Sequence, residues 1–175
     1  MSTLNVTTIA NVGGTTAATI DNNGHLTINN ATLTNVNSAG FYRAGTWTPV
    51  FADAPTGGNT SSTTAQTSNY VKIGSLVHVN FRFDNISTAG LTSGQGGYFQ
   101  GLPFAPNADA NGSLWFQSVN VGSNPVFIVP RAFVGSNYIR LEQVNDNAAD
   151  TLVTVAGYGN GTADVRVSMT YTTNE

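Results

Sequence analysis

The first 40 residues place the strongest constraint on how this chain can fold. They contain one acidic residue, Asp21, no Lys or Arg, and short stretches in which apolar residues alternate with Thr, Asn and Gly. A segment of this composition cannot bury a core of its own. Its alternating apolar positions still favour β-strands that pair with another surface. We therefore expect it to associate with identical copies of itself or with a larger assembly.

The apolar residues of this segment are the candidates for that attachment. They are Leu4, Val6, Ile9, Ile20, Leu26 and Ile28. Asn22-Asn23-Gly24 separates two of the alternating stretches, and Asn-Gly is a strong signal for a tight β-hairpin. The prediction for residues 1–40 is an extended, β-rich attachment segment.

Residues 41–175 are expected to form one head domain. The boundary falls near Ser38 to Gly45, where the Thr/Asn stretches stop and aromatic residues, an arginine and a proline follow. A chain of 175 residues accommodates one ordinary domain plus an appendage. The hydrophobic share of 40% is too high for a disordered chain, so we expect most of it to be folded.

A β-hairpin is predicted where residues 69–73 and 76–83 flank Gly74-Ser75. In the second stretch Val77, Val79, Phe81 and Phe83 alternate with His78, Asn80 and Arg82. This period of two is typical of an antiparallel strand with one buried face and one exposed face.

Further strands are expected along the rest of the head, and no stretch shows a helical period. The candidates are Tyr98–Phe104, Ser113–Val121, Val126–Phe133, Tyr138–Gln143, Thr151–Ala156 and Ala163–Thr172. The last two flank Gly157–Gly161, which we expect to be the loop of a second hairpin. Short strands with Gly, Pro and Asn turns predict an all-β fold, an antiparallel β-sandwich or jelly roll. Its lysine-poor edges suggest a homo-oligomer in which neighbouring copies cover them.

The charge excludes several classes of partner. Only 9% of the residues are charged, the net charge is −3, and the six Lys and Arg residues are scattered. Without a basic stripe we expect no nucleic-acid binding. The sequence shows no secretory signal and no stretch of about 20 apolar residues, so we expect synthesis in a cytoplasm and no membrane insertion.

Catalytic and metal-binding patterns are weak, so we expect neither an enzyme nor a bound cofactor or metal. The carboxylates are dispersed, and His25 and His78 lack partners at metal-ligand spacing. Two loops, Asn107–Gly112 and Asn145–Asp150, carry clustered oxygen side chains that suit calcium. Asn and Asp are also ordinary turn formers, which is the interpretation we favour.

Aromatic residues offer a possible stacking platform for sugars, or part of the core. They are Trp47, Trp115, Tyr98, Tyr158 and Tyr171. For the two tryptophans we favour the core.

Two sets of motifs resemble virion proteins of tailed bacteriophages. In the attachment segment the similar stretches are Ser2–Ile9, Gly14–Ala17 and Ala18–Gly24, which resemble the N-terminal segment of fibre-like chains from cyanophages and other marine phages. In the head they are Gly45–Pro49, Asn69–Val77 and Gly101–Phe104, which resemble C-terminal domains of phage tail fibres.

The resemblance implies a non-enzymatic, trimeric, β-rich virion component. Its N-terminus would bind other virion proteins, and its head would contact a glycan or protein of the host surface. Loops carry recognition on a rigid β scaffold, so the candidate contact residues are Asn107, Asp109, Asn111, Tyr158 and Asn160. One alternative is a capsid decoration or cement protein that binds the coat lattice, and another is a polysaccharide depolymerase.

Overall fold

The computed structural model describes residues 8–10, 16–23, 26–28, 42–122 and 125–175. The chain divides into two compact units, Met1–Val36 and Asn37–Glu175. The sequence placed the boundary a few residues later, after residue 40. Each unit is described by itself.

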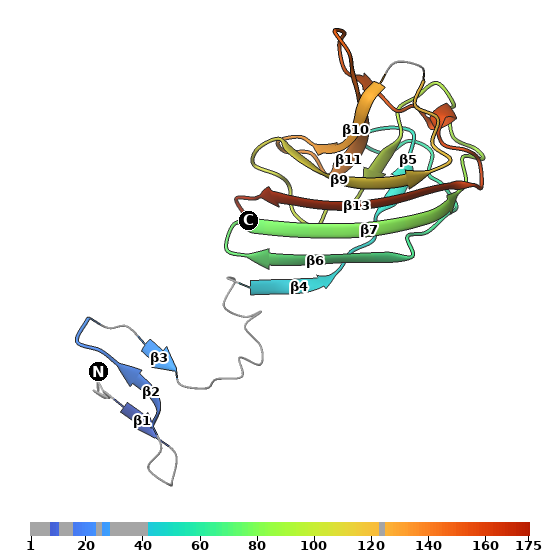
Figure 1. The fold of residues 1–175 in the computed structure, drawn as a ribbon. Helices are drawn as coiled ribbons and strands as arrows, with labels where there is room; N and C mark the ends of the chain where they lie inside the picture. The colour runs from blue at the N-terminus through green and yellow to red at the C-terminus, as the bar shows by residue number, and fades with distance from the viewer. Residues whose placement is uncertain (1–7, 11–15, 24–25, 29–41, 123–124) are drawn as a thin grey trace. The chain divides into compact units, whose positions relative to one another are not determined.

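The described residues of the N-terminal unit form a small antiparallel sheet of three strands (Figure 1). The strands are β1 (Thr8–Ala10), β2 (Thr16–Ile20) and β3 (Leu26–Ile28). Ile20 of β2 pairs with Leu26 of β3, which confirms the reversal expected around residues 22–24. At the start of this reversal, the Asp21 carboxylate accepts a hydrogen bond from the Asn23 N–H at 2.8 Å, which is a common turn-forming contact.

Within residues 42–122 and 125–175, the strands of the head form one ten-stranded antiparallel sheet that curls over itself (Figure 1). The first half contains β4 (Tyr42–Thr46), β6 (Thr67–Ile73), β7 (Leu76–Ile86), β13 (Ala163–Thr172) and β9 (Ala110–Gln117), in that order. The second half continues from β9 through β10 (Pro125–Ala132), β11 (Tyr138–Asn145), β8 (Tyr98–Gln100) and β5 (Val50–Ala52), with β12 (Thr151–Leu152) beside β11. This confirms the expected all-β, antiparallel, sandwich-like fold.

Strand β9 belongs to both halves and makes the corner of the sheet. Its first two residues, Ala110 and Asn111, pair with β10, whereas the stretch from Gly112 to Gln117 pairs with β13. A Cβ atom at Gly112 would lie 2.5 Å from the Ser168 carbonyl oxygen, closer than any real contact. The corner therefore needs glycine at this position.

The core lies between the two halves and is rich in aromatic rings. Phe81 and Phe83 of β7 lie 4.9 and 5.4 Å from the ring of Phe99 of β8, centre to centre. Phe51 of β5 packs at 5.1 Å from Phe99 and at 4.6 Å from Tyr158. These five side chains are at most 2% exposed, so the two halves are held together by one continuous aromatic cluster.

The predicted hairpin of β6 and β7 is confirmed. Ile73 pairs with Leu76 across Gly74, whose φ of 58° is easily adopted only by glycine. The alternation along β7 holds as well: its inward residues are buried, and His78 on the opposite face is exposed. Most of the other expected strands are present with shifted ends, while β4 and β5 were not expected as strands.

The second predicted hairpin, around residues 157–161, is wrong. The stretch from Thr151 pairs with β11 for two residues and then leaves the sheet as a short 3₁₀ turn, Val155–Gly157. The cause is burial: Val153, Val155 and Tyr158 are all at most 2% exposed, so the backbone follows the core instead of a partner strand. Among the described residues, no helix is long and apolar enough to cross a membrane.

Asp53 organises the loop that follows β5. Its carboxylate accepts hydrogen bonds from the Asn59 side chain and N–H, both at 2.8 Å, and from the Thr92 N–H at 2.9 Å. The residue is 4% exposed. These bonds, led by that of the Asn59 side chain, lower the pKa of Asp53 from 3.8 to about 2.

Replacing Tyr158 with Phe should leave the free energy of unfolding unchanged or raise it by up to about 1 kcal/mol. The buried hydroxyl of Tyr158 has no hydrogen-bond partner among the described residues, so its removal ends a desolvation cost. The matched control is Tyr171→Phe, because the Tyr171 hydroxyl donates to the Phe104 carbonyl at 2.8 Å and its loss should cost about 1 kcal/mol. Urea unfolding measures both; an equal loss in the two variants would contradict the prediction.

Acid should remove the stabilisation that Asp53 provides. Because the folded-state pKa is depressed, this contribution is present above pH 3.8 and is lost as the pH falls towards about 2. The Asp53→Asn variant should therefore show a smaller loss of stability over this interval and be less stable at neutral pH. Asn59→Ala, which removes the strongest of the bonds, should shift the acid-induced loss to higher pH. Unfolding curves recorded from pH 2 to 5 test this, and parallel curves for wild type and Asp53→Asn would rule it out.

Candidate binding groove

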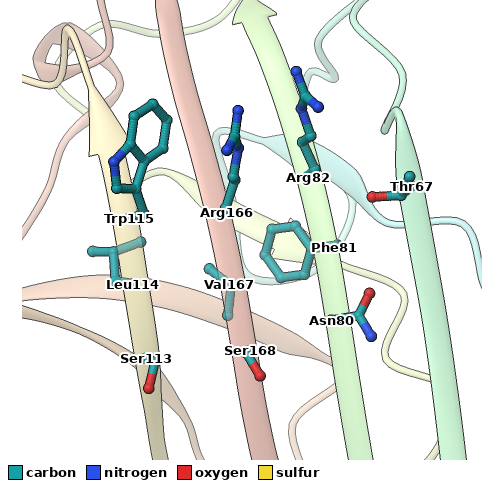
Figure 2. Close-up of a pocket in the computed structure, with 10 residues that line it drawn as sticks. All are labelled: Thr67, Asn80, Phe81, Arg82, Ser113, Leu114, Trp115, Arg166, Val167 and Ser168. Atoms are coloured by element: carbon teal, nitrogen blue, oxygen red, sulfur yellow. The ribbon is translucent and has the colours of Figure 1, made fainter.

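A shallow groove of about 440 Å³ crosses the outer face of strands β6, β7, β13 and β9 (Figure 2). It is the candidate functional site. The residues that line it include two arginines, one tryptophan and several hydroxyl and amide side chains, and none of them carries a carboxylate.

The first row of the groove combines cations with an aromatic ring. In the sheet register Arg166 of β13 lies opposite Arg82 of β7 on one side and Trp115 of β9 on the other, and Thr67 of β6 lies opposite Arg82. Figure 2 shows Trp115, Arg166 and Arg82 side by side. The alternation of each strand sends these side chains outward because their neighbours, such as Val165 and Val167, fill the core.

The second row, two residues along each strand, is polar and uncharged. Ser168 lies opposite Asn80 of β7 and Ser113 of β9. His78 follows on the same face of β7, and its ring nitrogens lie 3.0 Å from the Thr170 hydroxyl and 3.4 Å from the Ser168 hydroxyl. The row supplies donors and acceptors suited to neutral hydroxyl groups of a ligand.

The two arginines differ in how they are held. Arg82 binds Asp84 through two contacts, Nε to Oδ1 at 2.7 Å and Nη2 to Oδ2 at 2.5 Å, which raise the pKa of Arg82 and lower that of Asp84. The guanidinium of Arg166 instead lies 4.5 Å from the ring centre of Trp115. It makes no hydrogen bond or ion pair with any other residue in the described part of the chain. Arg166 therefore keeps its donors available.

Trp115 is 45% exposed, whereas Trp47 is 7% exposed and packs edge-on against Phe81. The expected core position is thus confirmed for Trp47 and wrong for Trp115. The reason is the alternation along β9: Leu114, the residue before Trp115, packs against the core, so Trp115 lies on the outward face. Sequence alone identified Trp115 as a possible sugar platform but did not associate it with Arg166.

The loops expected to contact a host do not come together. The 107–112 loop lies at the end of β13, where the Asn107 N–H donates to the Thr172 carbonyl. The 157–161 loop lies at the start of β13, where the Gly161 N–H donates to the Ile86 carbonyl. Ten residues of strand separate them, about 30 Å. They cannot form one site.

Several of the individual loop residues are engaged within the head. The Asn107 amide donates to Asn174 at 2.8 Å, and the Asn160 side chain accepts from the Thr88 N–H at 2.8 Å. Asn111 is exposed and pairs with Arg131 in the sheet. Tyr158 was expected on an exposed loop, which is wrong: it is 2% exposed and packs against Phe51.

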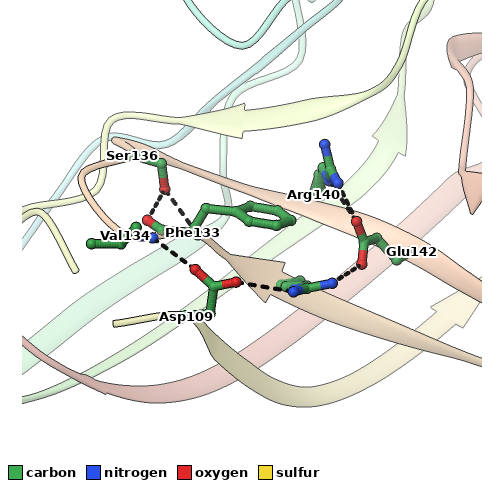
Figure 3. Close-up of polar contacts among 7 residues, drawn as sticks. Asp109, Phe133, Val134, Ser136, Arg140 and Glu142 are labelled. Carbon is green, nitrogen blue, oxygen red and sulfur yellow. Dashed lines mark hydrogen bonds and ion pairs between the residues drawn. The ribbon is translucent and has the colours of Figure 1, made fainter. Parts of the chain in front are cut away.

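Asp109, the residue before β9, belongs to a chain of ion pairs that reaches β10 and β11 (Figure 3). Arg131 bridges Asp109 and Glu142, at 2.9 Å to each, and Glu142 also binds Arg140. The ring of Phe133 lies 4.5 Å from the Arg131 guanidinium and 4.2 Å from that of Arg140. The Val134 N–H and Arg131 lower the pKa of Asp109. Two cations balance two carboxylates here, so the cluster is self-contained and fits a structural role.

The candidate attachment residues lie mostly beyond what the structure describes. Leu4 and Val6 are outside the described residues, and for Ile9, Leu26 and Ile28 only the strands that carry them are described. Ile20, on β2, is 39% exposed. In the described parts of the chain, no three His, Asp or Glu side chains gather as a metal site would require.

Neither the protein-family models nor the curated proteins compared with this chain give a match. The site is therefore interpreted from its own residues.

Proposed function

We propose that this protein is a short, homotrimeric tail fibre of a tailed bacteriophage, and that its head binds saccharides of the host surface through the groove on β6, β7, β13 and β9. Its N-terminal unit attaches it to other virion proteins. The phage context rests on the motif resemblance, and the binding role rests on the groove.

The observation that carries the binding role is the exposed ring of Trp115 in the groove. A large ring that remains 45% exposed on a sheet face contributes little to the core, but it offers a flat apolar surface for the face of a sugar ring. The guanidinium of Arg166 lies over one face of this ring, 4.5 Å from the ring centre, and stabilises its orientation, so the sugar would use the opposite face. An aromatic platform held in place before binding is what a weakly apolar ligand such as a saccharide requires.

The neighbouring polar row complements this platform. Asn80, Ser113 and Ser168 present amide and hydroxyl groups at the spacing of adjacent strands, about 5 Å. Sugar hydroxyls bind such groups. Because no carboxylate lines the groove, retention of a glycan fits this site better than hydrolysis by a pair of carboxylic acids.

Exposed apolar side chains and an exposed edge strand of the head support association between copies. Val71, Ile73 and Leu76 are 36 to 49% exposed around the turn of the β6–β7 hairpin. Strand β4 ends the strand order in the described part of the head and is exposed over most of its length. A second copy that covers β4 and these side chains would remove both an open edge and an apolar patch.

Replacing Trp115 with Ala should weaken binding of the full chain to host-surface polysaccharide about tenfold, because one ring-stacking contact is lost. The control is Phe127→Ala, which removes an aromatic ring that is 54% exposed on β10, outside the groove. Calorimetry or a glycan array measures both. Equal binding by wild type and Trp115→Ala would exclude the groove as the saccharide site.

Particles of the phage should carry this chain on the tail, in groups of three copies. Cryo-electron microscopy with the chain labelled at its C-terminus measures location and copy number together. Loss of residues 1–40 should abolish attachment to the particle. Density distributed over the capsid lattice would contradict the tail-fibre proposal and favour a capsid decoration protein instead.

A further inference from the structure

We infer that the saccharide bound in this groove is acidic, and that its carboxylate or sulfate group binds the guanidinium of Arg166. This inference rests on the proposed saccharide-binding function and names the class of its ligand.

Two like charges are paired across neighbouring strands of this face. Arg82 and Arg166 lie directly opposite each other on β7 and β13, where side chains approach to about 5 Å. Like charges in directly opposite positions destabilise a sheet. Asp84 forms its hydrogen bond and ion pair with Arg82 through both carboxylate oxygens, and it acts on Arg166 only through longer-range attraction. An anion bound at Arg166 would relieve the remaining repulsion.

The carboxylates of this face lie outside the lining of the groove. Asp84 and Asp164 each lie two residues from an arginine of the first row, on the side away from Asn80 and Ser168. Asp164 accepts a hydrogen bond from the Asn85 N–H at 2.8 Å, and Asp84 is bound to Arg82. The groove itself therefore carries two cations and no carboxylate, and its charge is complementary to an anion.

Arg166 is placed so that its donors can reach a ligand. Its guanidinium lies over the ring of Trp115, 4.5 Å from the ring centre, and no hydrogen bond within the described residues uses its N–H groups. Those N–H groups match the two oxygens of a carboxylate or sulfate. Trp115 thus both contacts the sugar ring and positions the cation beside it.

The polar row beside the cations favours an acidic saccharide over a free anion or an acidic peptide. The polar row of Asn80, Ser113 and Ser168 lies next to the cations and offers partners for several hydroxyl groups. A ligand that uses the first row with its acid group and the second row with its hydroxyls is a sugar acid or sulfated sugar within a polysaccharide. A carboxylate of an acidic peptide would use only the first row.

The test compares a uronic acid polysaccharide with the same polymer after its carboxyl groups are reduced to alcohols. Calorimetry with the full chain should show at least tenfold tighter binding of the acidic form, and this preference should decline as salt is added. Arg166→Ala should abolish the preference while it leaves binding of the reduced polymer little changed. Arg166→Lys should restore only part of it, because lysine keeps the charge but not the paired donors. Phe127→Ala again serves as the control, because this side chain lies on β10 outside the groove, and it should leave the preference unchanged.

The possible results distinguish a failure of the acidic ligand from a failure of saccharide binding itself. Equal affinity for the two polymers, with binding still lost in Trp115→Ala, would overturn the acidic ligand and leave saccharide binding intact. No binding of acidic, sulfated or neutral polysaccharides would overturn both. Binding of poly-glutamate as tightly as of the acidic polysaccharide, dependent on Arg166, would also overturn the inference in favour of an acidic peptide.

Discussion

The pairing of β7 with β13 determines both faces of the head at once. In this register the inward residues Phe83 and Val165 lie opposite each other, as do Phe81 and Val167, and the outward pair between them is Arg82 with Arg166. A slip by one residue would bring the arginines into the core and the phenylalanines to the surface. The aromatic core therefore fixes the register, and the register fixes the position of the groove. The shape of the site is a consequence of packing on the opposite side of the same two strands.

The charges of the head are distributed in two contrasting ways. The cluster around Phe133 balances Arg131 and Arg140 against Asp109 and Glu142, with Glu142 only 4% exposed. Such a cluster holds strands together and attracts no further ion. On the opposite half of the sheet, Arg166 stacks on Trp115 and has no bonded carboxylate in the described residues. In a chain with only 9% charged residues, this cation without a direct ion pair beside an exposed ring is the feature on which the proposed ligand rests.

Sequence periodicity predicted the part of the fold that depends on single strands. Alternation along residues 76–83 identified the buried and exposed faces of β7, and Gly74 marked the turn before it. It could not predict the neighbours of β13, because a strand's own pattern contains no information about its partners across the sheet. For this reason Trp115 and Arg166 were not connected, although their outward direction follows from the alternation of β9 and β13.

The loops were predicted less well than the strands, also for a physical reason. Gly157–Gly161 has the composition of a hairpin loop. Tyr158 within it packs against Phe51 and Phe99, so the backbone here follows the core. Asp109 is a residue type typical of surface turns, yet a strand further along the chain supplies its partner, Arg131, 22 residues away. Tertiary contacts of this kind override local turn preferences and are not visible in local sequence.

Binding of a saccharide beside Trp115 can be measured directly, because the two tryptophans differ in exposure. The indole N–H signals of Trp47 and Trp115 can be followed by NMR while oligosaccharides from the host-surface polysaccharide are added to the full chain. Because Trp115 is 45% exposed and Trp47 only 7%, a ligand in the groove should shift the Trp115 signal saturably and leave that of Trp47 in place. If the oligosaccharides bind and neither signal moves, the groove is not the binding site, and the account of this face is wrong.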